Sequence, residues 1–372
     1  MRSISDTMRR MAAFRATAPG VRVDPPAITP HRTLETLEGF GTNPGALLAK
    51  YHVPAGLPAQ APLVVVLHGC TQNAAGYDQG AGWSALADRA GFAVLFPEQK
   101  RANNPNLCFN WFMPEDTKRG GGEAMSIREM IEAMIVAHDL DRARVYITGL
   151  SAGGAMTAVM LATYPELFAG GAIIAGLPFG SARSVPEAFD RMRGHGGPDD
   201  ATLAALVKRA SNGHDGPWPT VSIWHGTADQ TVTFANMDRI AAQWHGIHGT
   251  GAAPDRTETS GRHTYTAWHG EDGRVAIELH EIDGMGHGTP IDPAGPDGLG
   301  RAAPHMLDVG VSSTAMIARS WGLVDAAEAK AAARSQRPVA SPRRPIRATA
   351  APHAGGVQKV IEDALRAAGL MR

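Results

Sequence analysis

The stretch Val145-Tyr146-Ile147-Thr148-Gly149-Leu150-Ser151-Ala152-Gly153-Gly154 decides the fold that we expect for this chain. Its first four residues form a short apolar run typical of a buried strand, and residues 152–163 have a helical pattern. Between them, Gly149 to Gly153 match Gly-x-Ser-x-Gly, the pattern of a serine on a tight turn between a strand and a helix. The glycines leave room for that turn because they lack side chains.

A serine in this position is typical of a nucleophile. The following helix would direct its free N–H groups and the positive end of its dipole at a developing oxyanion. The bare pattern arises easily by chance in a chain with 43 glycines. The interpretation of Ser151 as the nucleophile therefore depends on the strand before it and the helix after it.

Short β-branched runs alternate with helical patterns on both sides of this turn, from about residue 46 to residue 322. This alternation predicts a mostly parallel central sheet with helices on both faces, and with the serine turn it predicts the α/β-hydrolase fold. Further strands are expected at 63–67, 93–96, 171–175 and 221–224, a hairpin at 265–268 and 275–282, and helices at 83–90, 124–138, 152–163 and 235–244. A helical insertion, 177–219, precedes the strand expected to bear the acid and has helix-like pieces at 186–193 and 202–210.

A nucleophilic serine needs a general base and an acid that orients it, and in this fold the acid precedes the base along the chain. His287 lies in a glycine-rich loop after the last strand of the predicted sheet, where the base is expected. Asp229 follows the strand at 221–224 and is the predicted acid. Its alternative role is to cap the next helix, and Asp238 and Asp283 are the rival acids.

Two backbone N–H groups are expected to form the oxyanion hole. One belongs to Ala152, directly after the nucleophile. The other is expected in the loop after the strand at 63–67, and Cys70 is the natural donor there. The donor would be the amide of Cys70, so its side chain need not take part.

Several motifs resemble those of polyhydroxybutyrate (PHB) depolymerase-family esterases, in the family's order from about Pro44 to Gly322. They are Leu67-His68-Gly69-Cys70-Thr71-Gln72, the serine turn through Met156, Cys108-Phe109-Asn110-Trp111-Phe112, Gly120-Gly121-Gly122-Glu123, Trp224-His225-Gly226-Thr227-Ala228-Asp229 and Gly284-Met285-Gly286-His287. The resemblance implies ester hydrolysis through an acyl-enzyme, with 3-hydroxyalkanoate polyester or its oligomers as substrate. It also implies a disulfide between Cys70 and Cys108, for which a free thiol pair is the alternative.

Trp111 and Phe112 are the aromatic residues that we expect at the wall of the substrate pocket, with packing in the core as the alternative. No metal ion and no organic cofactor is implied by this chemistry. Acetyl and feruloyl esterases of plant polysaccharide are similar to the same family, and their substrates are the alternative. A less favoured alternative is a binding protein that kept the fold and lost catalysis.

The remaining sequence bounds the organisation of the chain. It has 372 residues, of which 44% are hydrophobic and 19% charged, and a formal net charge of −1, which gives no reason to expect a nucleic-acid partner. We expect a partly ordered lead-in at 1–40, a catalytic domain at 41–323, a Pro/Ala/Arg-rich linker at 324–356 and an amphipathic helix at 357–372 that packs on the protein itself or on a partner.

Two observations on location pull in opposite directions. The N-terminus has no apolar stretch typical of a secretory signal. No apolar run in the sequence approaches the roughly 18 to 20 residues that cross a membrane. The N-terminus alone therefore predicts a cytoplasmic protein. The family resemblance, and the disulfide that it implies, instead predict an extracellular and oxidising compartment.

Overall fold

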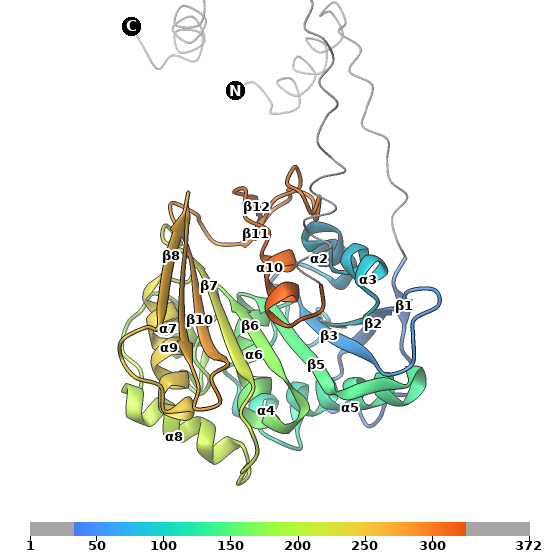
Figure 1. Cartoon of the computed structure of the whole chain (residues 1–372). Helices are drawn as coiled ribbons and strands as arrows, with labels where there is room; N and C mark the ends of the chain where they lie inside the picture. Colours follow the sequence, from blue (N-terminus) through green and yellow to red (C-terminus); the bar gives the residue numbers. More distant parts are fainter. Residues whose placement is uncertain (1–32, 325–372) are drawn as a thin grey trace, which may run out of the picture. The chain divides into compact units, whose positions relative to one another are not determined.

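A computed structural model describes residues 33–324, and Figure 1 shows their helices and strands. The predicted linker and C-terminal helix, and most of the predicted lead-in, lie outside the described residues. No helix within residues 33–324 has both the length and the apolar character needed to cross a membrane.

A ten-stranded sheet forms the centre of the structure, in the spatial order β1-β2-β4-β3-β5-β6-β7-β10-β9-β8. The inner strands from β4 to β10 are mutually parallel, whereas the strands at both edges pair antiparallel. The bounds are β1 Glu35–Thr36, β2 Leu48–His52, β3 Ala61–Leu67, β4 Ala93–Glu98, β5 Leu140–Leu150, β6 Gly170–Ile174, β7 Thr220–Gly226, β8 Arg256–Ser260, β9 His263–His269 and β10 Val275–Ile282. A separate parallel pair consists of β11 Thr289–Ile291 and β12 Met306–Asp308.

Helices cover both faces of the sheet, as the alternating sequence pattern predicts. One buried apolar cluster joins one face of the strands to α5, α6 and α9, and a second joins the other face to α2, α3 and α10 (Figure 1). The helix bounds are α2 Ala74–Ala81, α3 Trp83–Ala90, α4 Pro114–Thr117, α5 Gly122–His138, α6 Ala152–Thr163, η1 Pro165–Leu167, α7 Val185–Met192, α8 Asp200–Ala210, α9 Ala235–His248 and α10 Ser313–Ser320. The fold is thus the predicted α/β-hydrolase fold.

The register of the parallel strands brings their carboxyl ends to one edge of the sheet. Leu67 at the end of β3 pairs with Gly149 of β5, and Leu150 pairs with Ile174 at the end of β6. At the other side of β6, Gly226 at the end of β7 pairs with Ile282 at the end of β10. The loops that leave these strands therefore emerge close together, which is the condition for a site built from residues far apart in sequence.

Most predicted elements coincide with the observed ones, and two differences concern where strands begin. The predicted lead-in includes β1, which pairs with β2, so the sheet begins earlier than expected. Strand β5 also begins five residues earlier than predicted, at Leu140, because its first half is polar and carries no apolar signal.

The insertion between β6 and β7 contains α7 and α8, and one buried side chain of α9 that binds it is Gln243. Its amide nitrogen donates to the carbonyl oxygens of Phe179 and Leu203, each at 3.0 Å. Its amide oxygen accepts from the N–H of Phe179, also at 3.0 Å. A glutamine that is satisfied on both sides in a dry interior fixes the insertion more firmly than apolar packing alone would.

Helix α6 approaches the end of β3 closely at Gly153. A Cβ atom at this position would lie 2.4 Å from the carbonyl oxygen of Leu67 and 2.5 Å from that of His68. Both are backbone atoms and cannot rotate away. Gly153 therefore sets the distance between the serine turn and the loop that follows β3.

We expect Gly153→Ala to lower the free energy of unfolding by about 1–3 kcal/mol, because the methyl group forces α6 away from β3. Gly251→Ala is the control, since a Cβ there meets nothing within 4 Å. Urea denaturation of both variants and the wild type measures the difference. Equal stability of the two variants would contradict the close approach.

Candidate active site

Ser151 lies on the turn between β5 and α6 in a backbone conformation that side chains rarely adopt. Its φ is 57° and its ψ is −117°. The turn is held by the Ser151 N–H, which donates to the carbonyl oxygen of Ile174 at 2.9 Å. A non-glycine residue in this region costs free energy and persists only where the surroundings enforce it. Ser151 is 9% exposed, so the turn presents little more than one face of its side chain.

Asp229 and His287, which are 58 residues apart, form a hydrogen bond between Oδ2 and Nδ1 at 2.7 Å. Burial raises the pKa of the Asp229 carboxyl, but hydrogen bonds from His225 and His287 outweigh it and hold that pKa below its usual value. Asp229 is therefore ionised at neutral pH and can only accept. The proton of a neutral His287 ring must then be on Nδ1, which leaves the Nε2 lone pair available as a base.

The other contacts of Asp229 fix its orientation. Its Oδ1 accepts from the N–H groups of Thr231 and Val232, at 2.8 and 3.0 Å. The N-cap position of α9 is Phe234, so Asp229 does not take the alternative role of capping that helix. Of the rival acids, Asp238 lies inside α9, and the carboxylate of Asp283 accepts a hydrogen bond from Thr227 Oγ1 at 3.3 Å.

The loops that carry the acid and the base are bonded directly to each other. The Thr227 N–H donates to the carbonyl oxygen of Ile282, and the Ala228 N–H donates to that of Met285 at 3.0 Å. A Cβ atom on Gly226 would lie 2.2 Å from the same Met285 oxygen, so only glycine permits this approach. The Asp229–His287 geometry is therefore fixed by the backbone as well as by the side chains.

The loop after β3, which carries the predicted second oxyanion donor, is cross-linked. Cys70 forms a disulfide with Cys108, as the family resemblance implies. The Thr71 N–H donates to the carbonyl oxygen of Asn106 at 2.7 Å, which ties the same two segments by a second bond. The Gly69 N–H donates to Gln72 Oε1 at 2.8 Å and closes the turn. The backbone around Cys70 is thus held on both sides, which suits a preorganised N–H donor.

A buried polar chain supports this loop from beneath. His68 Nδ1 donates to the Gly69 carbonyl oxygen at 2.8 Å, and the Gln99 N–H donates to His68 Nε2 at 3.1 Å. Burial lowers the pKa of His68 to about 4, so the ring is neutral. The Gln99 side chain contacts Glu123 at 2.5 Å, and the Asn110 N–H donates to the other Glu123 oxygen at 2.8 Å. This series of hydrogen bonds links the loop after β3 to the segment that contains Cys108.

The two aromatic residues expected at the pocket wall differ in exposure. Trp111 is 6% exposed and belongs to the apolar core, while Phe112 is half-buried against it. Their rings meet edge to face, with centroids 5.3 Å apart. Their contact with substrate stays a prediction.

Two histidines near the acid and base were not predicted as site residues. His225 is fully buried, and its Nε2 donates to the Val232 carbonyl oxygen at 2.8 Å and lies 3.4 Å from Asp229 Oδ2. His305 Nδ1 donates to the carbonyl oxygen of His287 at 3.2 Å. His225 could have been found from its place near the carboxyl end of β7, whereas His305 comes from the β11–β12 connection and has no comparable signal in the sequence.

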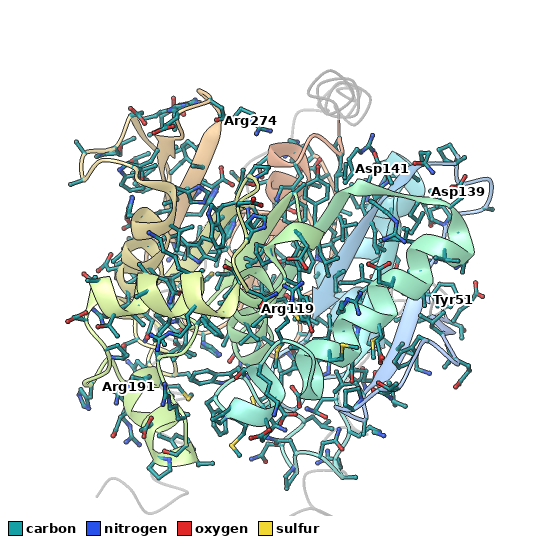
Figure 2. All side chains as sticks on the ribbon, turned by 90° about the horizontal axis from the view of Figure 1, so that it is seen from below. Tyr51, Arg119, Asp139, Asp141, Arg191 and Arg274 are labelled. Atoms are coloured by element: carbon teal, nitrogen blue, oxygen red, sulfur yellow. A yellow bond between two sulfur atoms is a disulfide. The ribbon has the colours of Figure 1, made fainter. Side chains whose placement is uncertain are left out.

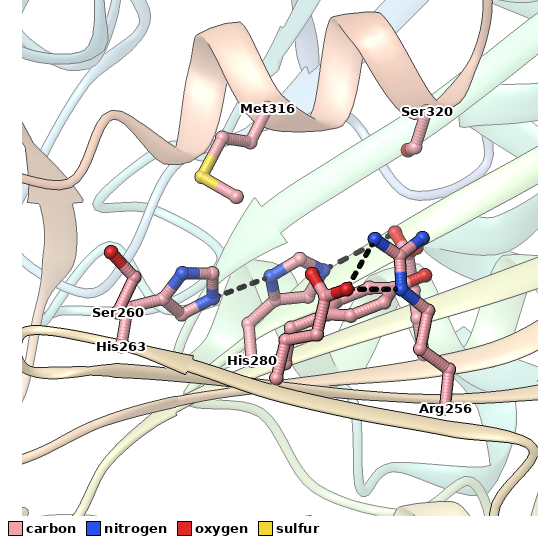
Figure 3. A pocket seen from close by; sticks show the side chains of 9 residues that line it. Arg256, Ser260, His263, His280, Met316 and Ser320 are labelled. Carbon is pink, nitrogen blue, oxygen red and sulfur yellow. Dashed lines mark hydrogen bonds and ion pairs between the residues drawn. The ribbon is translucent and has the colours of Figure 1, made fainter.

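A cavity of about 320 Å³ lies between the β8–β10 edge and α10, away from the predicted site residues (Figure 3). His263 Nε2 lies 2.9 Å from His280 Nδ1, and His280 Nε2 lies 3.3 Å from Glu278 Oε1. The His280 ring stacks on Trp224, with centroids 3.7 Å apart. His263, Glu278 and His280 lie along the cavity wall. Within residues 33–324 no cluster of three or more His, Cys, Asp or Glu side chains is placed to hold a metal ion.

The fold and the known proteins most similar to this chain define its class. A family model described as esterase PHB depolymerase matches residues 47–263. Poly(3-hydroxyalkanoate) depolymerase C of Paucimonas lemoignei is 46% identical over 292 residues, which cover 78% of this chain and 70% of that protein. Feruloyl esterase B of Talaromyces stipitatus is 30% identical, over 70% of this chain and 73% of that protein. A solved acetyl xylan esterase from Aspergillus awamori is 25% identical with a TM-score of 0.67, over 79% of this chain and all of that one.

The chain is therefore a carboxylic-ester hydrolase of the α/β-hydrolase fold. More particularly, it belongs to the PHB depolymerase family of esterases.

We expect loss of the disulfide to destabilise the protein by about 4 kcal/mol, from the loop entropy released between residues 38 apart in sequence. The free energy of unfolding of the Cys70→Ala/Cys108→Ala variant should equal that of the wild type measured in reductant. Urea unfolding with and without dithiothreitol gives both values. A reductant effect that persists in the double variant would show that the disulfide is not its origin.

Glu123 predicts a pH dependence of stability. Burial, and secondarily the charge of Asp116, raises its pKa to about 8 from 4.5 in an unfolded chain. Between these values the folded state holds a proton that the unfolded state lacks, so stability falls as pH rises, by up to about 1.4 kcal/mol per unit.

We therefore expect Glu123→Gln to lose less stability than the wild type between pH 5 and pH 8, measured by urea unfolding at each pH. Glu132→Gln, an exposed ion-pair change on the same helix, is the control and should follow the wild type. Parallel curves for Glu123→Gln and the wild type would contradict the raised pKa.

Proposed function

We propose that Ser151 is the nucleophile, His287 the general base and Asp229 the acid that orients it. The proposal is supported above all by the 2.7 Å hydrogen bond between Asp229 and His287, in loops at the same edge of the sheet as Ser151. Because Asp229 accepts a hydrogen bond from Nδ1–H of His287, Nε2 of that ring can take the proton of the serine hydroxyl. Ser151 Oγ then attacks the ester carbonyl.

The tetrahedral oxyanion is stabilised in this mechanism by the N–H groups of Cys70 and Ala152. This role is supported by the cross-linked loop around Cys70 and by the position of Ala152 at the start of α6. His287 next protonates the leaving alcohol, and water attacks the acyl-enzyme with His287 again as the base. Serine regains its proton and the carboxylic acid leaves.

The substrate that we propose is a 3-hydroxyalkanoate polyester or its oligomers. It is supported by the 46% identity to a poly(3-hydroxyalkanoate) depolymerase over most of the chain. An alternative is supported by the similarity to a feruloyl esterase and to the fold of an acetyl xylan esterase, which would make the substrate an acyl group on plant polysaccharide. Both substrates would react by the same acyl-transfer chemistry at Ser151. The two proposals therefore differ only in what the substrate pocket binds.

We expect Ser151→Ala to lower kcat for p-nitrophenyl butyrate by about 10³-fold or more, because the acyl-enzyme cannot form. The free energy of unfolding should not change. Asp229→Asn should also lower kcat strongly, because an amide can leave the proton on the wrong nitrogen of His287. Retained turnover in a clean Ser151→Ala preparation would exclude Ser151 as the nucleophile. A fluorophosphonate that fails to label the folded wild type would favour a binding protein without catalysis.

A comparison of three substrates separates the two proposed substrate classes: p-nitrophenyl butyrate, a 3-hydroxybutyrate trimer and acetylated xylan. Cleavage of the trimer in preference to xylan, by the wild type and not by Ser151→Ala, supports the polyester proposal. Preference for xylan keeps the same catalytic residues and overturns the polyester substrate.

A further inference from the structure

A second cavity, of about 70 Å³, lies in the insertion between β6 and β7, at its contact with the start of α9. Its wall includes Ser181, Arg191, Asn236 and the loop of residues 194–198. Figure 2 labels Arg191 on the side of the molecule away from Tyr51 of β2. None of the residues proposed for catalysis lines this cavity.

The cavity is lined by a partly buried cation, Arg191, that forms no ion pair within residues 33–324. Arg191 Nε and Nη1 are both buried, and within residues 33–324 neither has a hydrogen-bond acceptor. The guanidinium makes no ion pair with a carboxylate in that part of the chain either. A guanidinium cannot lose its proton to relieve its burial, so an unsatisfied one is costly. A protein that keeps such a group generally has a partner for it.

A second polar group on the same wall has the same character. Ser181 is 7% exposed, and its hydroxyl oxygen makes no hydrogen bond among the described residues. A hydroxyl can donate one hydrogen bond, Nε of a guanidinium can donate one, and Nη1 can donate two. The wall therefore offers donors of two kinds to one small space, which is the pattern expected for an acceptor-rich anion.

The backbone is shaped around Arg191. A Cβ atom on Gly196 would lie 2.5 Å from Arg191 Nη1, and one on Gly197 would lie 3.1 Å from its Cδ. Both glycines have positive φ, 64° and 100°, so side chains are disfavoured there for two reasons. The loop can therefore lie directly on the guanidinium.

The neighbouring arginine differs in that its charge is balanced. Arg239 forms an ion pair with Asp200 and donates to the carbonyl oxygen of Pro198. The end of α7 is also fixed, because Asn236 Nδ2 donates to the Arg191 carbonyl oxygen at 3.0 Å. The backbone of Arg191 is thus held in place.

We propose that this cavity binds a small oxyanion, a carboxylate or a phosphate, through the Arg191 guanidinium and the Ser181 hydroxyl. An unpartnered N–H of the guanidinium can donate to an oxygen of either group, and the volume accommodates a group of that size in place of a few water molecules. If the ligand is a carboxylate, its source would be a hydroxy acid released by ester hydrolysis, and this source rests on the proposed function. Binding of inorganic phosphate does not depend on the proposed function.

Thermal unfolding with added anion tests the proposal on the full-length protein. The probes are sodium phosphate and sodium 3-hydroxybutyrate, with sodium chloride at matched ionic strength as the reference. We expect a saturable rise in Tm with one or both probes, because a ligand that binds only the folded state stabilises it. The probe that binds more tightly identifies the source of the oxyanion.

Arg191→Met removes the charge and keeps the apolar stem, and it should weaken binding by about tenfold or more. Arg193→Met makes the same chemical change two residues along and should leave binding unchanged. Ser181→Ala should weaken binding by about 3-fold or more, and it keeps the proposal testable if Arg191→Met does not fold.

The same titrations in Ser151→Ala separate this site from the proposed function, because that variant cannot turn over and should bind the anion like the wild type. Two results would overturn the proposal. One is binding by Arg191→Met that is equal to that of the wild type. The other is the absence of a saturable Tm shift for either probe up to about 50 mM.

Discussion

The turn at Ser151 is the constraint on which the rest of the structure depends. Its left-handed backbone is held by a hydrogen bond to Ile174, and α6 can begin there only because Gly153 lets the helix rest on the carbonyl groups that end β3. Strain of this kind is stable only inside a rigid frame. The parallel sheet, with a buried apolar cluster on each face, supplies that frame. Gly226 plays a similar part between the acid and base loops.

The sequence predicts the centre of this fold well because the central strands are apolar on both faces. Strand β3 is buried along its whole length, and its pattern is unambiguous. The edge strand β8 is exposed at every position and has no apolar signal to detect. The three-residue strands β11 and β12 are too short to have a period. Prediction therefore failed where a strand is exposed or too short to show a pattern.

The candidate site divides in the same way. Asp229 and His287 follow the ends of strands that are adjacent in a parallel sheet, so chain order alone anticipates that they meet, although their catalytic roles remain a proposal. The links from His68 through Gln99 to Glu123 join three separate segments and depend on the packed interior. No spacing in the sequence encodes such contacts. The Cys70–Cys108 disulfide was anticipated only through the resemblance to a family.

The attachment of the insertion has a consequence for how this fold diversifies. Segment 177–219 leaves the sheet after β6 and returns at β7, and Gln243 of α9 holds it by three hydrogen bonds to backbone atoms. Backbone groups are common to every sequence, so a single glutamine on the scaffold can receive segments of different composition. The segment is thus a natural unit for recombination between relatives. A chimera that exchanges it should retain Gln243.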